Sequence, residues 1–69
     1  MDKETKIVLA IEDEKALYLF KRETDDFTTV EFVVGWIEGN SAIGDYVSGW
    51  SNGQYFRTLE EALSYLKRN

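Results

Sequence analysis

The sequence predicts an α+β fold, with a small antiparallel meander of about five strands followed by one C-terminal helix packed on one face. Short runs rich in β-branched and aromatic residues alternate with turn residues up to position 57, which is typical of strands joined by tight connections. From residue 58 onward the apolar period becomes helical. A chain of 69 residues forms one domain, expected over 5–69 after a frayed segment at 1–4.

The first two strands are predicted at 5–11 (TKIVLAI) and 16–23 (ALYLFKRE), separated by the charged turn 12–15. A helix across 9–22 is the competing interpretation, because Leu, Ala, Glu and Lys favour helices. We prefer a hairpin because the apolar runs on both sides of the polar break are short.

The third strand, 27–37, follows the turn 24–26 and is the richest in Val, Phe, Thr and Trp. A weaker strand is predicted at 42–51, and the Asn52-Gly53 pair predicts a hairpin turn into a last strand at 54–57. Short connections throughout indicate either a strongly twisted meander or a partly closed small barrel.

The segment 58–69 (TLEEALSYLKRN) is predicted to be the helix. Thr58 and Glu61 have the spacing of a capping box, in which each residue satisfies an exposed donor of the first turn. Apolar residues then recur at helical spacing and form one stripe, at Leu59, Ala62, Leu63 and Leu66.

Simple hairpins at every turn divide the strand residues between two faces of the sheet, since side chains alternate. The face expected beneath the helix holds Val8, Ala10, Leu17, Leu19, Val30, Phe32, Val34, Trp36, Ile43, Val47 and Phe56. The opposite face holds Ile7, Leu9, Ile11, Tyr18, Phe20, Val33, Ile37, Tyr46, Trp50 and Tyr55. We therefore expect Trp36 to be buried in the core and Trp50 to be exposed for contact with a partner. A bulge at Gly35 or Gly49 would exchange their roles, because a slip of one residue flips the side chains.

The chain has no His and no Cys, which removes the usual bases and nucleophiles of neutral-pH catalysis. We therefore expect no enzyme, no catalytic residue and no cofactor. The acidic groups at 12–14 and 23–26 are interpreted as solvated turns at opposite ends of the sheet, so no metal site is expected. Glu31, an acid within an apolar strand, is interpreted as an outward-facing residue near Arg22.

One short helix cannot cover both faces, and uncovered aromatic residues on a sheet are typical of an interaction surface. The predicted partner-binding residues are Tyr18, Phe20, Tyr46, Trp50 and Tyr55. The expected function is protein–protein binding, as a homodimer, with another protein, or as an acidic inhibitor of a protein that acts on nucleic acid. The alternative is binding of single-stranded nucleic acid through the same aromatic residues, which the net charge of −5 opposes.

Neither a signal peptide nor an apolar run of about 18 residues is recognised, so we expect a cytoplasmic protein that does not contact membranes.

Overall fold

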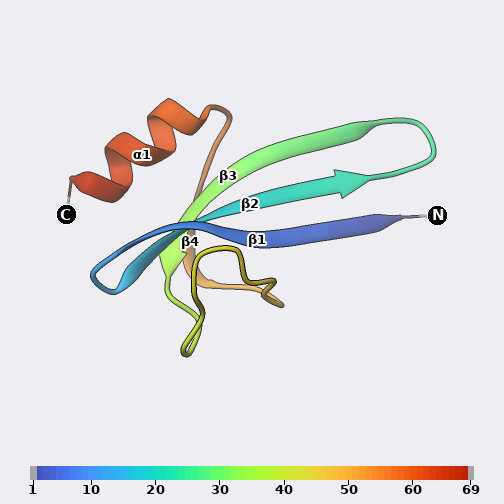
Figure 1. Ribbon diagram of the computed structural model, residues 1–69. Helices are drawn as coiled ribbons and strands as arrows, with labels where there is room; N and C mark the ends of the chain where they lie inside the picture. The colour runs from blue at the N-terminus through green and yellow to red at the C-terminus, as the bar shows by residue number, and fades with distance from the viewer. Residues whose placement is uncertain (1, 69) are drawn as a thin grey trace.

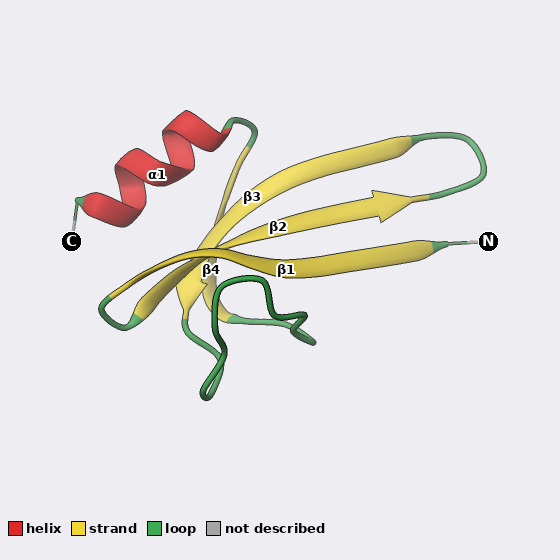
Figure 2. Cartoon of the chain, in the orientation of Figure 1, coloured by secondary structure: helices red, strands yellow, loops and turns green. Residues whose placement is uncertain are grey.

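The computed structural model describes residues 2–68 and shows a four-stranded antiparallel sheet and one helix (Figures 1 and 2). The elements are β1 (Lys3–Glu12), β2 (Lys15–Glu23), β3 (Thr28–Trp36), β4 (Ser51–Phe56) and α1 (Leu59–Lys67). The strands lie in sequence order, which confirms the α+β class and the meander with a C-terminal helix. The expected fifth strand does not form within 2–68, and the sheet stays open instead of closing into a barrel. β1 begins inside the segment expected to be frayed, of which Met1 lies outside the described residues.

The first two hairpins follow the predicted turns, and the competing helix over 9–22 does not form. Glu12 pairs with Lys15 across a two-residue turn in which Asp13 has a φ of 56°, a left-handed conformation that Asp tolerates better than most residues. The register between β2 and β3 is also as predicted, with Leu19 opposite Phe32.

A bulge in β1 changes the face to which its first half points. Ala10 pairs with Leu17, but Val8 pairs with Tyr18, so Leu9 has no partner on β2. Val8 was expected beneath the helix and instead packs on the opposite side, while Leu9 packs on the helix side. The inserted residue shifts the alternation by one position.

The predicted strand at 42–51 and the hairpin at Asn52-Gly53 are wrong. Residues 37–50 form a long loop whose only ladder contact within 2–68 is the isolated bridge between Tyr46 and Ile7. Asn52 and Gly53 lie inside β4.

Asn52 and Gly53 form a bulge in β4 opposite Gly35, between the pairs Val34–Gln54 and Trp36–Ser51. Asn52 has a φ of 54°, so the conformation that Asn-Gly favours is used for a bulge and not for a turn. A Cβ atom on Gly35 would lie 2.9 Å from the Ser51 carbonyl oxygen. Only glycine therefore lets β3 and β4 approach this closely.

The helix packs on one face of the sheet. Ala62 and Leu66 form a buried cluster with Leu17 and Val34, joined by partly buried Leu9, Ala10, Phe32, Phe56 and Leu63. α1 begins where predicted, because the Thr58 side chain accepts a hydrogen bond from the Glu61 backbone at 3.2 Å. Nine residues span only about 14 Å, so the ends of β1, β2 and β3 extend beyond the helix (Figure 1).

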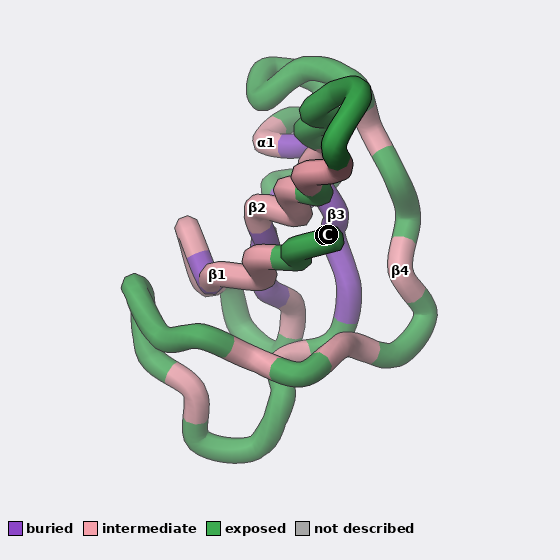
Figure 3. Tube along the Cα trace, turned by 90° about the vertical axis from the view of Figure 1, so that its right-hand side faces the viewer, coloured by how far each residue is buried: buried purple, intermediate pink, exposed green. Residues whose placement is uncertain are grey.

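The loop 37–50 covers the other face, below the sheet in Figure 2. The buried residues there are Val8, Ala16, Tyr18 and Val33, with Ile11, Phe20, Ile37, Val47 and Trp50 packed against them. Backbone hydrogen bonds tie the loop to the free edge of β1: Val8 donates to Asp45, Gly44 donates to Val8, and Val47 donates to Lys6. Figure 3 shows the buried segments on β1, β2, β3 and α1, whereas β4 is intermediate or exposed.

Four other residues predicted to be buried beneath the helix are not buried there. Val47 packs with Val8 on the loop side, and Val30, Trp36 and Ile43 are exposed.

Candidate partner-binding surface

Four of the five predicted partner-binding residues form one aromatic cluster, made of Tyr18, Phe20, Trp50 and Tyr55. Trp50 is its centre: its ring stacks on Tyr18 with centroids 5.0 Å apart and meets Phe20 and Tyr55 edge-on at 5.7 Å and 6.2 Å. The indole Nε1 donates a hydrogen bond to the Tyr55 hydroxyl at 3.2 Å. Such offset and edge-on pairs stabilise one another beyond simple burial.

Three segments of the chain build this cluster. Tyr18 and Phe20 are two residues apart on β2 and share its loop-side face. Tyr55 comes from β4, opposite Val33. Trp50 ends the loop and folds back over the sheet, where its indole lies directly against Gly53.

Tyr18 is fully buried, so it supports the surface from below and does not contact a partner itself. Its hydroxyl donates to the Trp36 carbonyl oxygen at 2.7 Å. Burial raises the pKa of the Tyr18 phenol above its ordinary value, and the nearby Glu38 carboxylate raises it further. The phenol therefore remains a neutral hydrogen-bond donor at physiological pH.

The remaining predicted residues differ in exposure. Tyr55 is 54% exposed, whereas Phe20 and Trp50 are partly buried. Tyr46 is 75% exposed and is bridged to Ile7 at the edge of β1. Ile7 pairs with Leu19, and Leu19 pairs with Phe32 of the helix-side cluster, so the Tyr46 side chain lies on the helix side and apart from the aromatic cluster. Trp50 is therefore a packed element of the loop-side surface, and Tyr55 is its exposed ring.

Lys6 belongs to this surface, although the sequence prediction did not include it. Its ammonium lies 5.7 Å from the Phe20 ring centroid and 5.9 Å from that of Trp50, within range of a cation–π interaction. It also donates to the Ser48 carbonyl oxygen at 3.1 Å and lies 3.5 Å from the Glu4 carboxylate. The bulge at Leu9 hid this position, because Lys6 faces Phe20 only in the shifted register.

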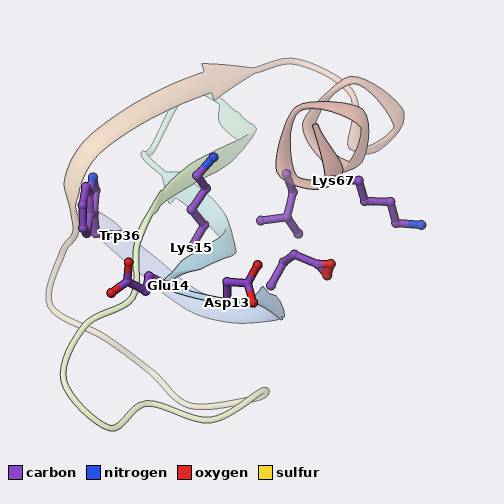
Figure 4. Close-up of a pocket in the computed structure, with 7 residues that line it drawn as sticks. Asp13, Glu14, Lys15, Trp36 and Lys67 are labelled. Carbon is purple, nitrogen blue, oxygen red and sulfur yellow. The ribbon is translucent and has the colours of Figure 1, made fainter. Parts of the chain in front are cut away.

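Trp36 occupies a hollow on the opposite, helix side of the sheet (Figure 4). It was predicted to be core, yet it is 51% exposed. The hollow has a volume of about 360 Å³ and is lined by Glu12, Asp13, Glu14, Lys15, Trp36, Leu66 and Lys67. Trp36 does lie on the predicted face, at the C-terminal end of β3, where the last turn of α1 lines the same hollow without covering the indole.

The acidic turns lie at opposite ends of β2, as expected. Over residues 2–68 no group of three or more acidic side chains is arranged to hold a metal ion. No helix within the same residues has the length and apolar character needed to cross a membrane.

No family model, curated protein or solved structure matches this chain.

Proposed function

We propose that this protein is a non-enzymatic module that binds another protein through the loop-side surface of its sheet. The supporting observation is the exposed Tyr55 ring beside a packed aromatic cluster centred on Trp50. Tyrosine suits protein interfaces because an apolar ring and a polar hydroxyl are buried together. A chain without His or Cys offers little for catalysis at neutral pH, which supports a binding role.

The surface is held in place before any partner arrives. Trp50 contacts three rings, its indole donates to Tyr55, and Lys6 fastens the end of the loop through Ser48. A side chain that is already ordered loses less conformational entropy on binding. The partner is another protein or a second copy of this chain. The net charge of −5 also suits a basic protein that acts on nucleic acid.

Single-stranded nucleic acid is the second candidate ligand, because the same face carries Lys6, and Arg22 lies beside it on β2. Both cations, however, already contact the Glu4 carboxylate, at 3.5 Å and 3.4 Å. A phosphate would have to displace that carboxylate, so we favour a protein partner.

The test compares exposed aromatic residues on and off this surface. A protein captured from native lysate would be identified and purified, and its affinity measured by calorimetry; light scattering would measure self-association. Tyr55→Ala should weaken binding by roughly tenfold or more. Phe27→Ala, at the exposed β2–β3 turn, is the matched control and should bind normally.

Two results would contradict the proposal. One is loss of binding in Phe27→Ala with Tyr55→Ala unaffected. The other is tight binding of a single-stranded oligonucleotide with a steep salt dependence, which would select the second candidate.

A further inference from the structure

The hollow beside Trp36 is a second surface, on the face of the sheet opposite the aromatic cluster. Its apolar part is formed by the exposed indole of Trp36 and by Leu66 of α1. Its rim is the β1–β2 turn, which carries Asp13 and Glu14 (Figure 4). Within residues 2–68 neither carboxylate forms an ion pair or a hydrogen bond.

The two lysines at this site do not neutralise these carboxylates. The Lys15 ammonium lies over the Tyr65 ring, 5.8 Å from its centroid, and Figure 4 shows Lys67 extending away from Trp36. Three acidic and two basic side chains line the hollow, so it combines an open indole face with a small negative excess and with two carboxylates that are not ion-paired.

The geometry of the hollow is fixed by the backbone. The Trp36 carbonyl oxygen accepts the Tyr18 hydroxyl, and the Ile37 amide donates to the Glu14 carbonyl oxygen at 2.9 Å. These bonds hold the acidic turn beside the end of β3. The distance between the indole and the acidic rim therefore does not depend on a flexible loop.

We propose that this hollow binds an arginine side chain presented by a basic protein partner. A guanidinium group is planar, stacks on an indole face and is also the cation best suited to carboxylate pairing. A hollow of about 360 Å³ lies near the lower limit for ligand sites, which suits one side chain and its flanking backbone. The net charge of −5 favours the approach of such a partner. This site does not depend on the aromatic surface proposed above.

The test uses the full chain, labelled with ¹⁵N, and the capped peptide Gly-Arg-Gly-Arg-Gly. The NMR signals of the protein's two tryptophan indoles are assigned by comparison with the Trp36→Phe variant. The arginine peptide should shift the Trp36 indole and the Asp13 and Glu14 amides in a saturable way. The same peptide with citrulline, a neutral analogue of arginine, should bind at least roughly fivefold more weakly.

Charge variants complete the experiment. Asp13→Asn with Glu14→Gln should weaken the arginine peptide by roughly threefold to tenfold. Asp26→Asn removes an acid at the far end of the sheet and should leave the affinity unchanged. Three results would overturn the proposal: equal binding of the citrulline peptide, equal binding of a lysine peptide, or shifts confined to the Trp50 indole. Retained signal dispersion in each variant shows that the fold is intact.

Discussion

Gly53→Ala is expected to destabilise the protein through one steric contact. A Cβ atom at this position would lie 2.6 Å from Nε1 and 2.7 Å from Cδ1 of Trp50, and 3.0 Å from a methyl group of Val33. Non-bonded heavy atoms pack at roughly 3.5–4.0 Å, so the indole would have to move by about 1 Å. That movement disturbs the stack on Tyr18 and the hydrogen bond to Tyr55.

The magnitude follows from two opposing terms. Overpacking of this kind costs about 1–3 kcal/mol. The lower entropy of the unfolded chain returns about 0.4–1 kcal/mol when glycine becomes alanine. Taken near their midpoints, about 2 and about 0.7 kcal/mol, the two terms leave a net loss of about 1–2 kcal/mol. This is a large share of the roughly 3–10 kcal/mol expected for a chain of this size.

Gly49→Ala is the matched control. Nothing lies within 4 Å of a Cβ atom built at Gly49, and neither Gly49 nor Gly53 has a positive φ. The control should be neutral, or more stable by up to about 1 kcal/mol.

Urea unfolding followed by tryptophan fluorescence gives both values, and thermal unfolding should place Gly53→Ala about 4–16 °C below the wild type. If Gly53→Ala were as stable as Gly49→Ala, the contact between Trp50 and β4 would be disproved.

Further variants test other parts of the structure. Trp50→Ala should cost about 3 kcal/mol, because it removes the centre of the aromatic cluster, whereas Trp36→Ala should cost less than about 1 kcal/mol; similar losses in chemical denaturation would contradict this assignment. Tyr18→Phe should cost about 1 kcal/mol, because the Trp36 carbonyl oxygen loses its donor. The raised pKa of Tyr18 means that the folded state keeps this proton longer than the unfolded state. Its contribution is present below the ordinary value of 10.0 and is lost as pH rises through the folded pKa, so the difference between wild type and Tyr18→Phe should shrink in alkaline urea titrations. Thr58→Ala removes the N-cap of α1 and should lower the free energy of unfolding by about 1 kcal/mol. The helical circular-dichroism signal should also decrease.

The parts of the fold that the sequence predicted depend on local chemistry. Thr58 and Glu61 identify the start of α1 because the cap involves residues three apart. The turn at Asp13-Glu14 follows from the polar residues there. The register between β2 and β3 follows from the position of the polar turn that joins them.

The parts that were missed depend on contacts between distant residues. The bulge at Leu9 has no glycine to mark it, and it lies where the loop bonds to Val8 and Lys6 at the edge of β1. Asn52-Gly53 signals positive φ, which fits either a turn or a bulge; the close approach of β4 to Gly35 selects the bulge. Local sequence could not show that approach.

The same limit applies to the candidate site. Sequence alternation placed Tyr18, Phe20, Trp50 and Tyr55 on one face, where the structure finds them in one cluster. It could not show that Tyr18 is fully buried while Tyr55 remains exposed, because burial depends on how far the loop reaches across the sheet.

The two tryptophans differ because different segments cover the two faces of the sheet. On the helix side, the last turn of α1 lines the hollow beside Trp36 and leaves the indole half exposed. On the other side, the loop places Trp50 against Tyr18. The exposed indole therefore lies beside the acidic turn, and the packed indole lies beside Lys6. Since the two surfaces lie on opposite faces, Trp36→Ala should abolish binding of the arginine peptide without changing capture by the loop-side surface that carries Tyr55. Loss of both activities in that variant would show that the two faces form one site.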